Sequence, residues 1–480
     1  MSQSDRPNIV FITTDQQRYD TLGVAGNARI RTPHMDALAG RGAFFEHACI
    51  QNTVCIPSRA CLQTGRYTHQ HGVLYMESEI DRTPGLPEWE LTFMERLQMA
   101  GYRTGATGKM HMMPQKGFNY ERLCGGKGSR WTQSEGLDIG PGPLGPTYAS
   151  WLEARHPGGY EEIYTQRRQP DYKNYMTAIT NVLPLEEYVD HWIAETSIEF
   201  LHYPGSDPFF LWIGFCGPHG PIDPPEPYDQ AYAFDEVPLP KQRRDNPPAS
   251  PKGRLTSRWQ EDEALIRRWR AYYWGLVTLI DDQIGRIMDV LERRGLMDNT
   301  LIALTSDHGE MAGDYNMMGK GNFYEEVIRA PMIVVPPGGG TAASRISGLV
   351  ETSDLAPTFL DYAGVDIPPQ MSAQTMRPLL EGRGAARESV LCEYMVNDRS
   401  HKGKCLRTDR YKYVFWGRDN EAEFYDLQED PDEQHNRYGD PACREEIDRH
   451  KDLLLDRLMA SERFYYRDET PSARELRVWM

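Results

Sequence analysis

Short runs of β-branched and aromatic residues recur along the chain, with segments of helical periodicity between them. The clearest runs cover residues 8–13, 102–106, 209–215 and 301–305, and a further candidate covers residues 332–335. These runs are apolar almost without interruption, which is typical of strands that are covered on both faces. The pattern therefore predicts an α/β fold whose large, mostly parallel sheet is flanked by helices.

The segment before the fourth run has the clearest helical pattern in the chain. Its apolar residues recur every three or four positions, and Gly295 follows them as a C-terminal stop. The repeating residues are Leu276, Leu279, Ile280, Ile284, Ile287, Met288 and Leu291. We therefore expect a helix that leads directly into the strand at residues 301–305.

The pattern changes after residue 377, where short strands with alternating polar and apolar residues follow one another. A small antiparallel sheet is predicted there, followed by an amphipathic helix and a polar tail. The strands are expected at residues 390–396, 405–407, 411–416 and 423–427, and the helix at residues 443–459. We therefore divide the chain into a catalytic α/β domain, residues 1–377, and a small C-terminal α+β subdomain with its tail, residues 378–480.

Two stretches show little regular periodicity. Residues 116–184 mix Gly, Pro, Tyr and Trp, and we interpret them as an irregular insertion that forms a pocket wall, a lid or a plain surface excursion. Its aromatic side chains suit stacking on a substrate ring and packing equally well, and they include Trp131, Tyr148, Tyr160 and Tyr164. Residues 223–251 hold eight prolines, which favours a stiff wrapping connection.

The composition narrows the classes of partner. The chain has 480 residues, and its 53 Lys and Arg against 70 Asp and Glu give a formal net charge of −17. This charge disfavours nucleic acid and membrane surfaces as partners, so an anionic substrate would need a local cationic pocket.

The sequence has no apolar stretch near the roughly 20 residues of a membrane span, and its first residues lack the apolar core of a signal peptide. We therefore expect a cytoplasmic protein whose eight Cys are mostly buried thiols.

Each of the four clearest predicted strands is followed by groups that suit metal or anion binding. These groups are Asp15 with Gln16, Lys109 with His111, His219, and Asp307 with His308. Taken alone, Asp15 suits a turn and His219 suits a loop. Their joint placement favours one site, because ligands bind at the carboxyl ends of the strands in an open parallel sheet.

The residues Asp15, Gln16, Asp307 and His308 form a set of ligands for one divalent metal ion. Oxygen donors dominate the set, which favours a hard ion such as calcium, magnesium or manganese. The imidazole nitrogen of His308 shifts the preference towards manganese. Calcium and manganese are the two ions that we expect.

The most specific segment is Thr53-Val54-Cys55-Ile56-Pro57-Ser58-Arg59-Ala60-Cys61-Leu62-Gln63-Thr64-Gly65-Arg66. Pro57 suits a first helical turn and Gly65 suits a C-terminal stop, so Cys55 is predicted to begin a short helix. The free amides of that turn favour negative charge on the Cys55 side chain. Arg59 adds a fixed cation one turn further along.

This segment resembles the signature of the sulfatase family, in the alkaline phosphatase-like superfamily, where Cys, Pro, a small residue and Arg precede Leu, Thr-Gly and Arg. The resemblance implies that a formylglycine-generating maturation enzyme oxidises Cys55 to formylglycine. Its hydrate would then be the nucleophile, would also ligate the metal, and would be assisted by Arg59. The alternative interpretation of Cys55 is an unmodified thiol, either reactive or merely buried.

Further motifs follow the order of the same family over roughly residues 8–440. Gly108-Lys109-Met110-His111, Pro218-His219 and Gly319-Lys320-Gly321 resemble its sulfate-binding elements. The resemblance implies that Lys109 grips the sulfate and that His111 hydrogen-bonds the hydrated aldehyde. It also implies that His219 and Lys320 contact sulfate oxygens and assist the leaving alcohol.

The two metal-ligand pairs depart from the pattern of many sulfatases. Those enzymes carry Asp-Asp and Asp-Asn, whereas this chain has Asp15-Gln16 and Asp307-His308. The latter arrangement resembles the related phosphonate monoester and phosphodiester hydrolases, which share the fold and the formylglycine. Lys109 and His111 favour the sulfatase interpretation, because a second cation suits a sulfate monoester better than a bulkier diester.

We therefore predict hydrolysis of small-molecule sulfate monoesters to an alcohol and inorganic sulfate. The alternative within the fold is a phosphonate monoester or phosphodiester hydrolase with the same nucleophile and metal site. A non-enzymatic alternative is a metal-dependent anion sensor that keeps Cys55 as a thiol. The sequence determines neither the alcohol half of the substrate nor the oligomeric state, and a homo-oligomer is compatible with it.

Overall fold

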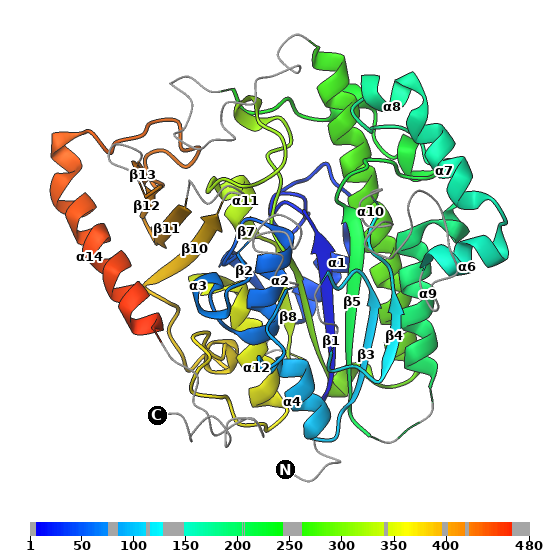
Figure 1. The fold of residues 1–480 in the computed structure, drawn as a ribbon, viewed down its shortest axis with the longest axis horizontal. Helices are drawn as coiled ribbons and strands as arrows, with labels where there is room; N and C mark the ends of the chain where they lie inside the picture. Colours follow the sequence, from blue (N-terminus) through cyan, green and yellow to red (C-terminus); the bar gives the residue numbers. More distant parts are fainter. Residues whose placement is uncertain are drawn as a thin grey trace.

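The computed structural model describes residues 6–74, 85–111, 116–127, 148–203, 205, 207–242, 262–339, 344–395, 402–417 and 422–462. A large twisted sheet lies between two helical layers, and a smaller sheet with the C-terminal helix lies beside it (Figure 1). The predicted α/β class is confirmed in both of these parts. In the described ranges, no helix combines the length and the apolar composition that crossing a membrane requires.

The large sheet has the strand order β4-β3-β5-β1-β6-β8-β2-β7, and β9 also pairs with β2. Its strands are β1 (Asn8–Asp15), β2 (Ala43–Cys49), β3 (Arg103–Gly108), β4 (Tyr120–Leu123), β5 (Phe209–Pro218), β6 (Thr300–Ser306), β7 (Arg329–Ala330), β8 (Met332–Val335) and β9 (Ser344–Glu351). Strand β1 is central and runs parallel to β5 and β6, whereas β8 runs antiparallel to β6 and β2. The predicted mostly parallel sheet is therefore confirmed, with β7 and β8 as the antiparallel members.

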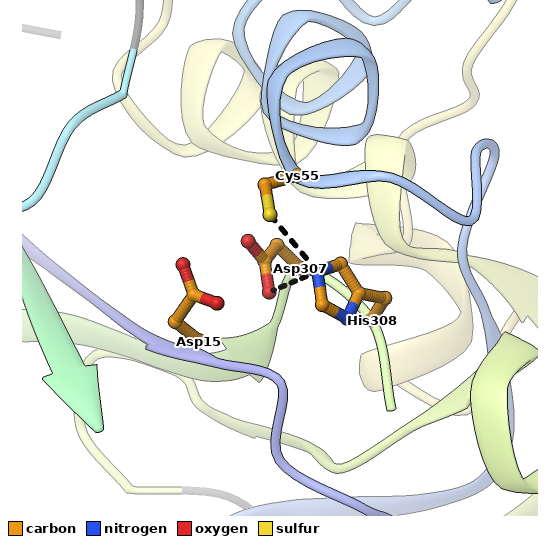
Figure 2. Close-up of side chains that lie close together, drawn as sticks. All are labelled: Asp15, Cys55, Asp307 and His308. Atoms are coloured by element: carbon orange, nitrogen blue, oxygen red, sulfur yellow. Dashed lines mark hydrogen bonds and ion pairs between the residues drawn. The ribbon is translucent and has the colours of Figure 1, made fainter. Parts of the chain in front are cut away.

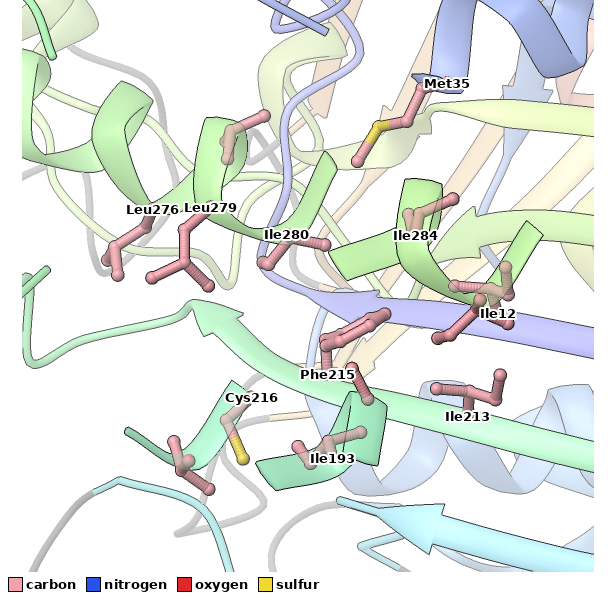
Figure 3. Close-up of a cluster of buried hydrophobic side chains, with 14 of the residues drawn as sticks. Ile12, Met35, Ile193, Ile213, Phe215, Cys216, Leu276, Leu279, Ile280 and Ile284 are labelled. Atoms are coloured by element: carbon pink, nitrogen blue, oxygen red, sulfur yellow. The ribbon is translucent and has the colours of Figure 1, made fainter. Parts of the chain in front are cut away.

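Successive side chains of the buried strands point to opposite faces of the sheet, and a layer of helices covers each face. Val10 and Ile12 of β1 belong to one core cluster, which includes side chains of α1 (Pro33–Arg41), α9 (Val189–His202) and α10 (Glu263–Arg293). Figure 3 shows this face, where Ile280 and Ile284 of α10 approach the strands. Ile9 and Phe11 point to the opposite cluster, which includes side chains of α2 (Cys55–Thr64), α4 (Phe93–Met99) and α12 (Leu355–Tyr362).

The remaining helices are short or lie at the edges of the sheets. They are α3 (Thr68–His71), α6 (Tyr148–Arg155), α7 (Gly159–Arg168), α8 (Pro170–Asn174), α11 (Glu325–Ile328), α13 (Arg377–Leu380) and α14 (Arg444–Ser461). Single 3₁₀ turns occur at Leu185–Glu187, Tyr228–Gln230, Phe234–Glu236, Met297–Asn299, Asp314–Asn316, Thr352–Asp354 and Pro441–Cys443. The helix predicted before residue 295 is α10, which starts earlier than its apolar repeat indicates, because Asp262 caps its first turn.

The prediction of an irregular insertion at residues 116–184 is wrong for much of its described part. Strand β4 and helices α6, α7 and α8 lie within it, and Trp131 lies outside the described residues. Tyr148, Tyr160 and Tyr164 are buried in the core cluster under α9 and pack on one another. Aromatic packing between short helices replaces a regular apolar repeat here, which is why the periodicity is weak. Residues 223–242 form short turns, as their prolines predict, and residues 243–251 lie outside the described ranges.

The small sheet is antiparallel, in the order β10 (Ser389–Met395), β11 (Lys402–Thr408), β12 (Tyr411–Phe415) and β13 (Ala422–Asp426). Helix α14 packs on it through a cluster that includes Ile447 and Leu454. A second cluster joins its other face to Ile50 and Val54, the residues between β2 and α2. The small sheet thus supports the segment that leads into α2.

Ile213 tests the packing of the central layer. It lies on β5 with no exposed surface, in the same cluster as side chains of α9 and α10. Replacing Ile213 with valine removes one buried methyl group, so we expect the free energy of unfolding to fall by about 0.5 to 1.5 kcal/mol. Urea unfolding followed by circular dichroism measures the change.

The same substitution at Ile367, which is 37% exposed, is the control. There we expect a change within about 0.5 kcal/mol, because little apolar contact is lost at the surface. Equal effects at the two positions would contradict the packing described for the central layer.

Candidate active site

The ends of β1 and β6 bring two polar pairs side by side. Thr14 pairs with Ser306 in the parallel register, so the residues that follow, Asp15 with Gln16 and Asp307 with His308, leave the sheet at the same edge. Gln16 has a φ of 68°, a conformation that few residues other than glycine adopt, and such strain is concentrated at functional sites. Its backbone amide donates to Asp307 Oδ1 at 3.1 Å, which holds the two pairs together.

Helix α2 carries Cys55 as its first residue. The helix ends before Gly65, whose φ of 63° is the left-handed stop that the sequence predicts. Ser58, in the first turn, donates to the Asp307 backbone oxygen at 2.6 Å and so ties the N-terminus of the helix to the end of β6. All residues of the helix are buried, so Cys55 is fixed against the sheet edge.

Asp15, Cys55, Asp307 and His308 form a compact buried group in which one ligand atom of each lies within 4.8 Å of the others. Figure 2 shows Cys55 pointing from the end of α2 towards His308, with the carboxylates beside them. His308 Nε2 lies 3.2 Å from Cys55 Sγ, and Nδ1 lies 2.9 Å from the Gly309 carbonyl. Because a carbonyl only accepts, Nδ1 carries the proton.

The protonation state of His308 suits a metal ligand. Burial lowers its pKa to about 4, so the imidazole is neutral near pH 7. With the proton on Nδ1, the lone pair of Nε2 faces the group of carboxylates. This is the tautomer in which a histidine binds metal through Nε2.

The surroundings of this group fit a cation. Asp15 Oδ1 is buried and has no hydrogen-bond partner among the residues that the structure describes. The ammonium of Lys320 approaches three of the other candidate ligands, at 3.1 Å from Gln16 Oε1, 2.7 Å from Cys55 Sγ and 2.8 Å from His308 Nε2. Two carboxylates, an amide oxygen and a neutral imidazole thus present lone pairs to one small volume, as a divalent ion requires.

Arg59 bridges the carboxylates of Asp15 and Asp307. Its Nη2 lies 3.0 Å from Asp15 Oδ2 and its Nε lies 2.9 Å from Asp307 Oδ2, with all three side chains fully buried. Its Nη1 donates to the Lys109 backbone oxygen at 2.8 Å. The guanidinium therefore neutralises both carboxylates and holds Lys109 in place.

Lys109 follows β3 at a point where two strands approach closely. A side chain at Gly108, whose φ is 83°, would place Cβ 2.1 Å from the Gly214 oxygen, so only glycine fits before Lys109. Lys109 Nζ lies 2.6 Å from Asp15 Oδ2. Burial acts to lower the pKa of Lys109, but the negative charges of Asp15, Cys55 and Asp307 together outweigh it, and the net pKa is raised. Lys109 is thus a permanent cation beside the carboxylates.

The two remaining predicted histidines, His219 and His111, follow the ends of β5 and β3. His219 follows β5, its side chain is 24% exposed, and its Nε2 lies 4.0 Å from Asp15 Oδ1. His111 is half-buried, and burial together with the charges of Lys109 and Arg59 lowers its pKa well below the usual value. The structure therefore gathers all the residues that the sequence singles out around one edge of the sheet.

Cys55 differs electrostatically from other buried thiols of the chain. Burial is the largest cause of a rise in the pKa of Cys49 to about 12. At Cys55 burial and the charges of Asp15 and Asp307 also act to raise the pKa, but the ammonium of Lys320 and a hydrogen bond with His219 act against them, and the net pKa lies below the usual value. The position is therefore built to stabilise negative charge on the atom attached to its Cβ.

One buried group escaped the sequence analysis. Glu310 is 1% exposed and accepts a hydrogen bond from Gln16 Nε2. The only signal in the sequence is its place three residues after Asp307, within a segment already rich in ligands. Its contacts are with residues that lie far away in the chain or in the next turn, which local patterns do not reveal.

Comparison with known proteins identifies the family. A profile of the family described as Sulfatase matches residues 7–365. A second profile, described as N-sulphoglucosamine sulphohydrolase, C-terminal, matches residues 313–460. The chain therefore belongs to the sulfatase family, as the signature around Cys55 indicates.

Individual relatives agree with this assignment over nearly the whole chain. An arylsulfatase from Clostridium perfringens is 30% identical over 499 residues, and the alignment covers 96% of each of the two chains. An N-acetylglucosamine-6-O-sulfatase from Bacteroides thetaiotaomicron is 26% identical, with 98% of this chain and 89% of the relative covered. The protein is a sulfuric ester hydrolase.

The fold also has solved counterparts. A crystal structure of the phosphonate monoester hydrolase of Agrobacterium radiobacter superposes with a TM-score of 0.79 at 24% identity, covering 95% of this chain and 96% of the other. This match confirms the predicted alkaline phosphatase-like architecture.

Proposed function

We propose that this protein hydrolyses sulfate monoesters to an alcohol and inorganic sulfate, with formylglycine at position 55 and its hydrate as the nucleophile. The observation that carries the proposal is the position of Cys55 Sγ, 2.7 Å from Lys320 Nζ and 3.2 Å from His308 Nε2 at the buried start of α2. The ammonium of Lys320 would stabilise negative charge on any oxygen attached at this position, and the lone pair of His308 Nε2 would help to hold a cation beside it. The family signature around Cys55 supports its conversion by a maturation enzyme.

Asp15, Gln16, Asp307 and His308, together with the hydrate at position 55, would hold one calcium or manganese ion. When bound, the ion supplies Lewis acid chemistry for the sulfate oxygens and for the hydroxyl of the nucleophile. Arg59 prepares this site, because it balances the two carboxylates and fixes their orientation. Lys320 would release its three ligand contacts and become available to the substrate.

Lys109, Lys320 and His219 would hold the nonbridging oxygens of the sulfate. Lys109 remains protonated beside Asp15, so it serves as a charge and not as a proton donor. His219 or Lys320 would protonate the leaving alcohol, and the negative sulfate favours the protonated form of His219 in the complex. The lowered pKa of His111 keeps its imidazole neutral, the form that accepts a proton from the hydrate.

Phosphonate monoester or phosphodiester hydrolysis is the second candidate. Gln16 and His308 favour it, since these residues resemble the metal pairs of that branch of the superfamily. Lys109 favours the sulfatase reaction, because its ammonium lies 2.6 Å from Asp15 Oδ2 and adds a second fixed cation to the site. An anion sensor with an unmodified thiol would require Cys55 to stay unconverted.

The test is a matched pair of substrates, an aryl sulfate and the corresponding aryl phosphonate monoester. The enzyme is loaded with metal, and conversion of Cys55 is verified by peptide mass. We expect kcat/KM for the sulfate to be higher by at least about tenfold, a difference of roughly 1.4 kcal/mol. The reverse preference would make phosphonate hydrolysis the main activity and Gln16 with His308 its better indicators.

A further inference from the structure

The buried carboxylate of Glu310 links the first metal-ligand pair to the loop that carries Lys320. Its Oε2 accepts a hydrogen bond from Gln16 Nε2. Its Oε1 accepts from the backbone amides of Ala312, at 3.0 Å, and of Gly319. Each oxygen of Glu310 therefore has a defined set of donors.

The contact with Gln16 matters because the two ends of an amide differ. The oxygen of Gln16 can bind a metal ion, whereas its NH₂ group only donates hydrogen bonds. An ionised carboxylate only accepts, so Glu310 can face Nε2 and not Oε1. Lys320 Nζ lies at the opposite end of the amide, 3.1 Å from Oε1, which requires the same orientation.

The backbone of Gln16 is held separately from its side chain. Its amide nitrogen donates to Asp307 Oδ1 at 3.1 Å, and its carbonyl accepts from the Tyr273 hydroxyl at 2.6 Å. Asp307 and Tyr273 thus fix the backbone from which the Gln16 side chain extends. The choice between the two amide orientations is made at the far end of the side chain, by Glu310 at Nε2 and Lys320 at Oε1.

We propose that Glu310 is a positioning residue that turns Gln16 Oε1 towards the divalent metal. The inference rests on the metal site of the proposed function, and Glu310 itself does not touch the ion. Glu310 acts through Gln16, because its carboxylate accepts a hydrogen bond that only the NH₂ end of the Gln16 amide can donate.

Glu310→Gln tests the proposal with a side chain of nearly the same shape. The carboxamide oxygen at position 310 would stay on the two backbone donors, so its NH₂ group would face Gln16. The Gln16 amide would then turn over and present NH₂ to the metal site. We expect the affinity for Mn²⁺, measured by isothermal titration calorimetry on the full chain, to fall by about 10- to 100-fold.

Two further variants separate orientation from charge. Glu326→Gln removes a buried carboxylate that pairs with Lys241 at 2.9 Å and not with Gln16, and its Mn²⁺ affinity should equal that of the wild type. The double variant Gln16→Glu with Glu310→Gln keeps the total charge of the wild type and restores an acceptor for the NH₂ group at position 310. It should regain most of the lost affinity.

The outcomes distinguish this inference from the proposed function. Tight Mn²⁺ binding by the wild type with equal binding by Glu310→Gln would overturn the role of Glu310 and leave the metal site intact. Weak binding that the double variant does not restore would assign the effect to the Gly319 loop and likewise overturn it. Failure of the wild type to bind either Mn²⁺ or Ca²⁺ would overturn the metal site and this inference together.

Discussion

Replacing Cys55 with alanine is expected to abolish sulfate ester hydrolysis without unfolding the protein. The substitution removes the thiol whose oxidation gives the aldehyde, so no hydrate can form at position 55, and it leaves the ion pairs of Arg59 with Asp15 and Asp307 in place. We expect kcat/KM for an aryl sulfate to fall by at least about 10⁴-fold, as is usual when a covalent nucleophile is deleted. Kinetics and a thermal melt followed by circular dichroism measure the two properties.

Cys61→Ala is the matched control for this experiment. Cys61 lies on the same buried helix, but its sulfur contacts Thr68 and His71 and not the ligand group. Its loss should leave the activity within a small factor of the wild type. Turnover by Cys55→Ala well above the uncatalysed rate would refute the nucleophile, and loss of folding in both variants would point to a packing role for α2.

Replacing Arg59 with methionine is expected to cause the largest loss of stability. Without the guanidinium, Asp15 and Asp307 would remain fully buried, and Asp15 would keep its contact with the ammonium of Lys109. Removing one partner from a buried network of this kind lowers the free energy of unfolding by about 3 to 5 kcal/mol. Urea unfolding of metal-free protein is the measurement, because a bound ion would mask part of the effect.

Arg41→Met provides the comparison at the surface. Arg41 pairs with Glu292, and the side chains are 44% and 51% exposed. Solvent screens this pair, so we expect its loss to change the stability by less than about 1 kcal/mol. Similar effects for the two variants would show that Asp15 and Asp307 do not both carry a negative charge in the folded protein.

Much of the fold could be read from the sequence because the central elements carry strong local signals. The predicted strand at residues 332–335 coincides with β8, and the one at residues 301–305 lies within β6. The short helix at Cys55 also agrees, since Gly65 ends it in the left-handed conformation. These elements are buried on all sides, and uniform apolar composition marks such segments clearly.

Other elements could not be predicted because their local signals are mixed. Strand β9 begins with exposed residues at the edge of the sheet, and only its last residues are buried. Strand β2 carries Glu46 and His47 in its middle, which interrupts its apolar run. Helices α6 and α7 are held by aromatic packing of Tyr148 against Tyr160 and Trp192, so their apolar repeat is weak. In each case contacts with other elements decide the structure, not local propensity.

The sequence by itself determined the family and indicated the proposed nucleophile position and the candidate metal ligands, because each lies in a short motif with its own local chemistry. Only the tertiary structure decided how these groups face one another. The contact between Gln16 and Glu310 spans 294 positions, and that between Arg59 and Asp307 spans 248. Such contacts depend on the placement of β1 between β5 and β6, and the strand order of a sheet is set by packing over the whole chain.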